Sequence, residues 1–242
     1  HEIMPFGQYG FNFSHSVAYS HISVYTAWLK TNYPTEFMCG LLNSENPNSD
    51  KSQVYLSECT EMNIEILPPD INKSGENYRV NDNSSIFSGF SCVKGLGVKA
   101  LDEIVSQQPF NSLYDFLFKV NSRVVNKTSI QALAKSGAFD CFGVPRKHIF
   151  DNYAKIRTKA KNYYKKNETL DGLPKIEGEE WSKKELLIAE KQSLGRTISA
   201  NLSEAYEGFF SENSIVTRLS EIPTLPEKRV VKIEGLIKNK IK

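Results

Sequence analysis

Two glycines separated by one residue constrain this chain more tightly than any other local feature. They stand in the run Val93-Lys94-Gly95-Leu96-Gly97, which a segment with helical spacing of apolar residues follows. Glycine has no Cβ atom, so the run permits a tight turn and lets the backbone approach another group closely. The first N–H groups of a helix lack acceptors within the helix, and the helix dipole makes that end attractive to anions. The run therefore predicts a tight turn that leads into a helix.

This arrangement resembles the hairpin of a helix-hairpin-helix DNA-binding element. The N–H groups at the helix start would face a phosphate, and two lysines would add positive charge. Because the contact is made to the backbone phosphate, it carries no sequence specificity. The same glycines are also explained by a turn with no ligand. The predicted DNA-binding residues of this hairpin are Lys94, Gly95, Leu96, Gly97 and Lys99.

A second and weaker unit lies farther along the chain. Arg123, Asn126 and Lys127 precede a helical pattern that includes Ile130 and ends near Gly137. This unit lacks the paired glycines. Two such units, joined by a helix around residues 113–116, would make a duplicated module. Arg123, Asn126 and Lys127 are therefore also predicted to bind DNA.

The remaining pattern predicts a mainly α-helical chain with a small mixed α/β insertion. Apolar residues recur at three- and four-residue spacing from Val17 to Leu29, as a buried helical stripe requires, and Ser14 is placed to cap that helix. Pro34 suits the first turn of the next helix. Further helices are expected at 51–62, 151–168 and 181–194, a strand at 64–67, a hairpin of 78–80 with 86–88, and a last strand at 230–237.

The composition is that of an ordinary globular protein. Hydrophobic residues make up 40% and charged residues 24% of the 242 residues, which excludes a chain that is disordered throughout. No apolar run approaches the ~20 residues of a membrane span, and the N-terminus has no signal-peptide pattern. The chain does not begin with Met, so we expect a fragment or a processed product, located in the cytoplasm. The net charge is only +2.

Metal and catalytic motifs are not apparent in the sequence. The four cysteines, Cys39, Cys59, Cys92 and Cys141, include no Cys-x-x-Cys pair, and the histidines do not stand near them in metal-ligand spacing. Buried free thiols are therefore a better interpretation than a structural zinc site. The sequence has no nucleophile elbow, P-loop or Asp-x-Asp pair. It predicts no catalytic residues and no metal ligands, and it favours a binding segment over a complete enzyme.

A second candidate site precedes the first helix. Ser14 and His15 form a polar pair at the expected helix start, close to Tyr9 and Gly10. His15 at a helix N-terminus would face a phosphate. On composition alone, a serine cap with an incidental histidine is the simpler interpretation.

The order of these motifs resembles the C family of bacterial replicative DNA polymerases, the polymerase III alpha subunits. The resemblance is collinear over nearly the whole chain, and for this reason it is more specific than any single motif. The segments that carry it are residues 6–19, 25–30, 33–38, 67–72, 89–97, 125–127, 133–140 and 185–195.

The resemblance implies a role for each part of the chain. Tyr9 matches the aromatic residue that stacks on the base of the incoming nucleotide, and His15, with Ser14, lies near its triphosphate. The implied partners are primer-template duplex DNA, a deoxynucleoside triphosphate and the remainder of the polymerase chain. The implied domains are the C-terminal part of the fingers (1–63), a tandem helix-hairpin-helix DNA-binding domain (64–168), a helical linker region (169–228) and the first strand of an OB domain (229–242).

The chain departs from the family pattern at two places. Phe13 stands where the family usually has a lysine. Residues 165–180 contain Asn167-Glu168-Thr169-Leu170 in place of the family's clamp-binding peptide, so we do not expect the sliding clamp to bind through this segment. The palm carboxylates that hold Mg²⁺ in this family would lie upstream, and no cofactor is expected within these residues. The chain is thus expected to be an inactive segment of a DNA-directed DNA polymerase.

Two other interpretations of the sequence stay open. A freestanding helix-hairpin-helix accessory protein, from a split polymerase gene, would carry the same DNA-binding residues. A structural interaction protein would use the basic block from Lys155 to Lys166 for a protein partner and would not bind DNA.

Overall fold

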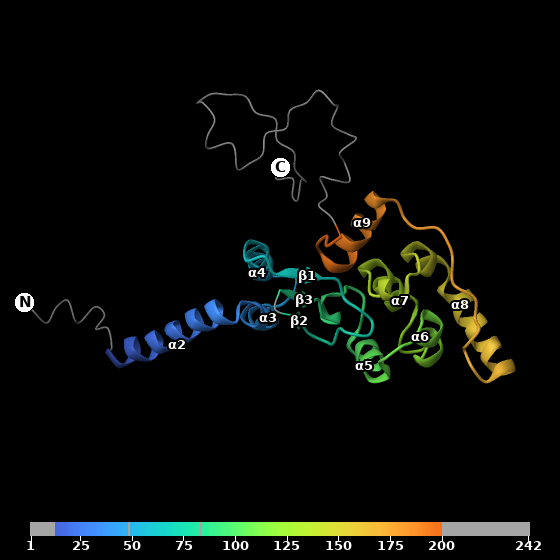
Figure 1. The fold of residues 1–242 in the computed structure, drawn as a ribbon, viewed down its shortest axis with the longest axis horizontal. Coiled ribbons are helices and arrows are strands. Elements are labelled where there is room, and N and C mark those ends of the chain that lie inside the picture. Colours follow the sequence, from blue (N-terminus) through green and yellow to red (C-terminus); the bar gives the residue numbers. More distant parts are fainter. Residues whose placement is uncertain (1–12, 48, 83, 200–242) are drawn as a thin grey trace, which may run out of the picture. The chain divides into compact units, whose positions relative to one another are not determined.

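The computed structural model describes residues 13–47, 49–82 and 84–199, and it divides the chain into two compact units, residues 1–92 and 93–242. The described part is mostly helical and contains one three-stranded sheet (Figure 1). The predicted mainly α-helical chain with a small mixed insertion is therefore confirmed. Tyr9, the predicted strand at 230–237 and the whole of 229–242 lie outside the described residues.

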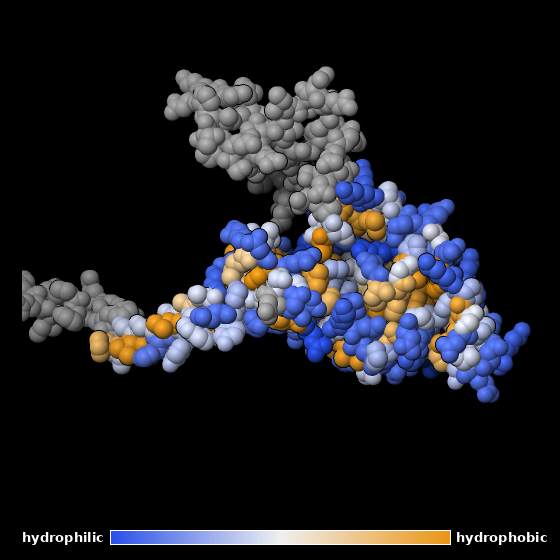
Figure 2. All heavy atoms as spheres, in the orientation of Figure 1, coloured by the Kyte–Doolittle hydropathy of each residue, from blue (hydrophilic) through white to orange (hydrophobic). Residues whose placement is uncertain are grey.

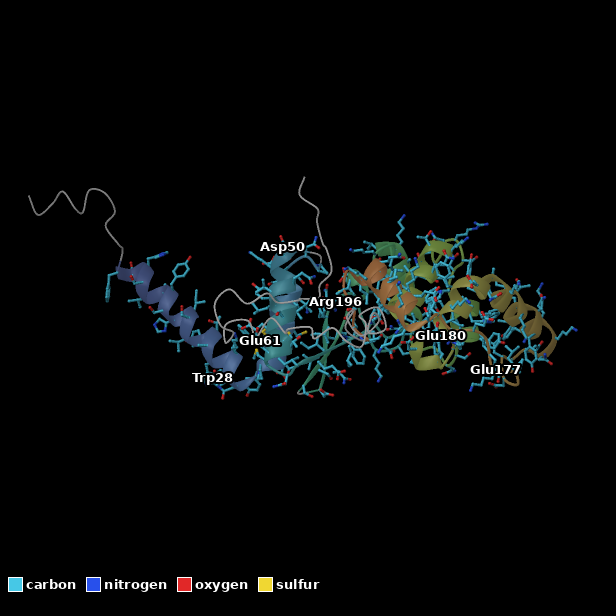
Figure 3. All side chains as sticks on the ribbon, turned by 90° about the horizontal axis from the view of Figure 1, so that it is seen from above. Trp28, Asp50, Glu61, Glu177, Glu180 and Arg196 are labelled. Carbon is cyan, nitrogen blue, oxygen red and sulfur yellow. The ribbon has the colours of Figure 1, made fainter. Side chains whose placement is uncertain are left out.

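Three helices open the described part of the first unit: α2 (Phe13–Asn32), α3 (Pro34–Ser44) and α4 (Asp50–Glu61). Pro34 begins α3 as predicted, because proline's missing N–H has no acceptor to lose at a helix start. The hydroxyl of Ser49 caps α4 by accepting a hydrogen bond from the N–H of Ser52 at 3.1 Å. Asp50 and Glu61 mark the two ends of α4 in Figure 3. The predicted helix at 51–62 is confirmed within one residue.

The apolar stripe of α2 is not buried, which corrects the prediction. Tyr25 is 64% exposed and Trp28 is 54% exposed, and no residue of α2 is buried. Figure 2 shows hydrophobic side chains on the surface of α2. Periodicity predicts the helix correctly but says nothing about what covers the stripe. Ser14 lies inside α2, which already includes Phe13, and so it is not the predicted cap.

The sheet of the first unit contains β1 (Glu65–Leu67), β2 (Arg79–Asp82) and β3 (Ser85–Phe87) in the order β1-β3-β2. β2 and β3 form the predicted hairpin, with Val80 opposite Ile86. β1 pairs with β3 in parallel, with Ile66 opposite Ile86. The carboxylate of Asp82 accepts hydrogen bonds from the N–H of Ser84 at 2.9 Å and from the hydroxyl of Ser85 at 2.7 Å, which fixes the turn between β2 and β3.

The first unit closes with the 3-10 helix η1 (Phe90–Cys92) over a small apolar core. Met38, Leu42, Ile86 and Phe90 are fully buried. Three of the four cysteines, Cys39, Cys59 and Cys92, are buried free thiols as predicted, whereas Cys141 in the second unit is exposed. Burial raises the pKa of the Cys39 thiol, so that thiol stays protonated at neutral pH.

The described part of the second unit consists of helices and connecting loops, without a strand. Its elements are α5 (Val98–Gln107), α6 (Leu113–Lys119), α7 (Lys127–Ser136), the 3-10 helix η2 (Asp140–Phe142), α8 (Arg146–Asn167) and α9 (Lys183–Leu194). The helix predicted at 151–168 is correct but begins five residues earlier, at Arg146. The helix predicted at 181–194 begins at Lys183, after a capping box made by Ser182 and Glu185.

An aromatic cluster holds α6 against the end of α7. The ring of Phe116 lies edge-on to Phe110 and Phe139, with centroid distances of 5.0 Å and 4.9 Å. Phe116 and Phe139 are fully buried. Edge-to-face pairs add about 1 kcal/mol each to the contribution of their buried area, so this cluster is a main source of stability in the second unit.

Buried charges join α8 and α9. The guanidinium of Arg146, at the start of α8, donates to Glu190 Oε1 on α9 at 2.8 Å and to Asp140 Oδ1 at 2.9 Å. Glu190 is fully buried, and its other oxygen accepts from the N–H of Ile198 at 2.9 Å and of Ser199 at 3.1 Å. Burial alone would raise the pKa of Glu190, but the donors from Ser199, Ile198 and Arg146 outweigh it and lower that pKa.

We predict that Glu190→Gln lowers the free energy of unfolding by about 3 kcal/mol at neutral pH, because Arg146 stays buried with one carboxylate fewer. A lowered pKa in the folded state means that the ionised carboxylate stabilises the protein above the unfolded pKa of about 4.3. That contribution is lost as the pH falls through the folded-state pKa. Urea denaturation at neutral and at acidic pH measures both effects.

Glu177→Gln is the matched control, because Glu177 is exposed and has no hydrogen bond or ion pair within the described residues. The control should match the wild type at every pH. The wild type and Glu190→Gln should converge in stability at acidic pH. Equal stability of the two at neutral pH would contradict the role assigned to Glu190.

Candidate nucleic-acid interface

The first predicted hairpin forms a tight turn followed by a helix. The N–H of Leu96 donates to the carbonyl of Val93 at 3.2 Å, and Gly95 has a φ of +93°, which an L side chain rarely adopts. Gly97 stands at the N-cap position of α5 with a φ of −79° and has no side chain to cap the helix. The predicted turn and helix start are therefore confirmed.

The N-terminus of α5 is open to solvent. The carbonyl of Gly97 accepts from the N–H groups of Ala100 and Leu101, both at 3.0 Å. Within the described residues, no acceptor faces the N–H groups of Gly97, Val98 or Lys99. Val98 is 71% exposed, and the first turn of α5 contains no acidic residue. The positive end of the helix dipole thus points outward with free donors, as an anion site requires.

The second predicted hairpin has a similar form without the paired glycines. The carbonyl of Asn121 accepts from the N–H groups of Val124 and Val125 at 3.0 Å and 2.8 Å, and Val125 is fully buried as an anchor. Asn126 caps α7, because its side-chain oxygen accepts from the N–H of Ser129 at 3.1 Å. Arg123 and Lys127, like Lys94 and Lys99 in the first hairpin, are exposed.

Packing brings the first hairpin against the start of α7. A Cβ atom built on Gly95 would lie 3.6 Å from Thr128 and 3.6 Å from Ala132, so the turn rests on the first two turns of that helix. The N–H of Lys94 donates to the carbonyl of Ser193, at the end of α9, at 2.7 Å. The turn of the first hairpin and the start of α7, which belongs to the second hairpin, are therefore neighbours.

A groove of about 180 Å³ follows this contact, and sequence reasoning did not find all of its residues. Lys135 lies on the groove, donates to Gln192 Oε1 at 2.9 Å and stands 5.2 Å from the ring centre of Phe150. In the sequence, Lys135 follows Lys127 by eight residues, about two helical turns along α7. This spacing is the one sequence pattern that points to Lys135. The lining residues are Lys94, Thr128, Gln131, Ala132, Lys135, Phe150, Gln192 and Ser193.

The predicted nucleotide-binding residues belong to the first unit. Ser14 and His15 lie in the first turn of α2, where the His15 ring stands 4.3 Å from the ring of Tyr19. Phe13, at the position where a lysine is usual, is 81% exposed. Tyr9 lies outside the described residues. Among residues 13–47, 49–82 and 84–199, no group of three or more histidine, cysteine, aspartate or glutamate side chains is arranged to hold a metal ion.

Comparison with known proteins identifies the class of this hairpin region. A family model described as a helix-hairpin-helix motif matches residues 63–149, which include both hairpins. The turn at Gly95 and the helix starts at Val98 and Lys127 are the features of that motif in this chain. In the described residues, no helix is long and apolar enough to cross a membrane.

Relatives of the chain extend the identification beyond this motif. The chain is 36% identical to DNA polymerase III subunit alpha of Campylobacter jejuni over 85% of its length, 34% identical to that of Thermus aquaticus over 98% and 36% identical to that of Bacillus subtilis over 99%. It covers 19%, 20% and 22% of those three relatives, or about one fifth of their length. The chain is therefore related to one segment of the DNA polymerase III alpha subunits, and the predicted resemblance is confirmed.

The two glycines of the first hairpin differ in what they contribute to folding, and this leads to a prediction. Gly95→Ala should lower the free energy of unfolding by about 1 kcal/mol, because a side chain is strained at a positive φ. Gly97→Ala should cost less, because Gly97 has an ordinary φ, nothing lies within 4 Å of a Cβ built there, and the lower entropy of the unfolded chain offsets alanine's weaker preference for the N-cap. Urea denaturation of the 242-residue chain measures both values, and a larger loss for Gly97→Ala than for Gly95→Ala would refute this account.

Proposed function

We propose that this chain is a segment of a bacterial-type, DNA-directed replicative DNA polymerase and that its hairpins bind the duplex of the primer and template. The observation that carries this proposal is the open N-terminus of α5, where unpaired N–H groups lie between exposed Lys94 and Lys99. Main-chain donors of this kind suit a phosphate oxygen. The relationship to polymerase III alpha subunits indicates that such a phosphate belongs to DNA.

The geometry favours binding that does not depend on DNA sequence. A main-chain N–H group at a helix start reaches a phosphate but carries no side chain that reads a base edge. Gly97 leaves the approach open, since nothing in the protein lies within 4 Å of its missing Cβ. Arg123 and Lys127, both exposed, add charge at the second hairpin. A replicative polymerase must hold every sequence equally, and contacts of this kind meet that requirement.

The proposed nucleotide site is at the other end of the chain. Tyr9 stacks on the base of the incoming deoxynucleoside triphosphate, and Ser14 and His15 face its phosphates. The absence of acidic residues from the first turn of α2 supports this assignment, because the positive end of the helix dipole is then not opposed. Phe13 is exposed but carries no charge. Within the described residues, His15 and the positive end of α2 are therefore the groups that attract the phosphates.

DNA binding through the first hairpin predicts a defined response to salt. About four phosphate contacts give a slope of about −3 to −4 in a plot of log affinity against log salt concentration. Gly97→Val should weaken binding of a primed duplex and reduce this slope by about 1 to 2, because the valine side chain blocks the phosphate without straining the backbone. Fluorescence anisotropy at several salt concentrations gives both quantities.

Gly40→Val provides the matched control for that experiment. Gly40 lies on α3 in the first unit, and nothing is within 4 Å of a Cβ built there, so the same side chain is added in the unit that does not contain the hairpins. This control should bind duplex DNA as the wild type does. If Gly97→Val retains the affinity and slope of the wild type, the hairpin does not hold DNA and the proposal fails.

The nucleotide assignment predicts a change in the complete polymerase. The isolated chain is expected to be inactive, because the palm carboxylates of the family are not among these residues and metal-dependent transfer depends on them. Tyr9→Ala in the full-length enzyme should raise the KM for nucleotide about fivefold or more, since stacking on a base is worth about 1–3 kcal/mol. Primer extension with varied nucleotide measures this, while the affinity for duplex DNA should not change. An unaltered KM would remove Tyr9 from the site.

A further inference from the structure

The longest helix of the second unit carries a row of lysines on one face. Lys155, Lys159 and Lys166 lie at offsets of four and seven residues, which a period of 3.6 residues brings to one side of α8. A shallow groove runs along this side. The residues that line it are Ala154, Lys155, Thr158, Lys159, Asn162, Tyr163 and Lys166.

A second hollow, of about 260 Å³, continues this groove toward the start of α8. Lys155 and Lys159 line both, so the two form one channel. From His148 to Lys166 the channel follows the helix for about 27 Å, at a rise of 1.5 Å per residue. The residues that line the second hollow are Tyr114, His148, Asn152, Lys155, Ile156, Lys159, Lys175, Ile176 and Glu177.

The chain that follows α8 lines the second hollow through Lys175, Ile176 and Glu177, whereas the first groove is lined by α8 alone. The hydroxyl of Tyr163 donates to the carbonyl of Asp171 at 2.8 Å, and the hydroxyl of Tyr114 donates to the carbonyl of Pro174 at 3.3 Å. A Cβ atom built on Gly178 would lie 2.0 Å from Nδ1 of His148, so the backbone there rests directly on α8. These contacts hold residues 171–178 against α8 and α6, so the second hollow is a fixed feature of the fold.

The charge in the channel is not balanced by the protein. Lys155, Lys159, Lys166 and Lys175 form no ion pair in the part of the chain that the structure describes, whereas Lys119 and Lys147 elsewhere in the unit each pair with a carboxylate at 2.8 Å. Among the residues that line the two hollows, Glu177 is the one acid (Figure 3). In Figure 2 the outer end of α8 is covered mainly by hydrophilic side chains. Such a channel attracts a polyanion.

We infer that this channel binds the sugar-phosphate backbone of single-stranded DNA, as a site separate from the hairpins. Its length suits several consecutive phosphates better than one small anion. A basic groove beside an exposed aromatic surface is the usual form of a site for a single strand, and here half-buried Tyr163 lines the groove, whereas Tyr114 is buried. Duplex DNA admits a lone helix into its major groove, but at the second hollow α8 is not a lone helix, because Lys175, Ile176 and Glu177 lie beside it.

The test compares two pairs of substitutions on the same helix. Lys155→Gln with Lys159→Gln removes two charges from the channel, and Lys161→Gln with Lys165→Gln removes two exposed charges that do not line it. Glutamine has nearly the helix propensity of lysine, so α8 should persist in both variants, which circular dichroism verifies. The probe is fluorescein-labelled oligothymidylate, and the readout is its anisotropy over a range of salt concentrations.

The channel pair of substitutions should reduce the slope of log affinity against log salt by about 1.4, at about 0.7 per phosphate contact with a single strand, and should weaken binding several-fold. The other pair should change the slope by less than half as much. An equal effect of the two pairs would show that only net charge matters and would overturn the proposal. A loss confined to duplex DNA would overturn it as well.

Two further measurements distinguish this site from a site for small polyphosphates and from the hairpins. Inorganic tripolyphosphate should not displace the oligonucleotide at a phosphate concentration equal to that of the DNA, and displacement would indicate a site for small polyphosphates instead. Gly97→Val should leave the affinity for oligothymidylate unchanged. If Gly97→Val fails to affect duplex binding, the proposed hairpin function is wrong while the single-strand result stands. If it abolishes single-strand binding, the channel is not the site.

Discussion

The buried pair between Arg146 and Glu190 is the interaction on which the second unit depends. The pair joins the start of α8 to α9. Removal of either charge leaves the other charge buried without full compensation. Ser193, three residues after Glu190, accepts the N–H of Lys94 at 2.7 Å. The position of the first hairpin is therefore set by the same helix that the ion pair holds. The ion pair is thus connected through α9 to the turn that precedes α5.

The local parts of this fold could be predicted from the sequence, because they depend on neighbours along the chain. Gly95 and Gly97 predicted the turn and the helix start, and the hairpin of β2 and β3 followed from short apolar runs around a polar turn. The start of α8 could not be predicted in this way. The N–H of Arg146 donates to Glu180, 34 residues away, at 2.6 Å, and that carboxylate satisfies donors that the local sequence leaves open. The exposed stripe of α2 shows the same limit, since spacing along a helix does not tell what covers it.

The residues of the candidate interface also differ in whether the local sequence predicts them. Lys94, Lys99, Arg123 and Lys127 were predicted because each stands beside a turn or helix start that the sequence predicts; the structure shows that all four are exposed, and their contact with DNA stays a prediction. Lys135 was not predicted, because its place in the groove depends on Gln192 of α9 and Phe150 of α8, which are distant from it in the sequence. Asn126 stabilises the start of α7 whether or not it contacts DNA, because its side-chain oxygen accepts a hydrogen bond from the N–H of Ser129. A substitution at Asn126 would therefore change the stability of α7 and any DNA contact together.

The hairpins and the α8 channel offer phosphates two different kinds of donor. At α5 the donors are main-chain N–H groups, which are fixed by the helix and lose no side-chain entropy when a phosphate binds. Along α8 the donors are lysine side chains, which are long and mobile and so adapt to a strand whose phosphates have no fixed spacing. A rigid duplex suits the first kind and a flexible single strand suits the second. The two proposed sites would therefore serve different forms of DNA, and their different chemistry lets each be altered without the other.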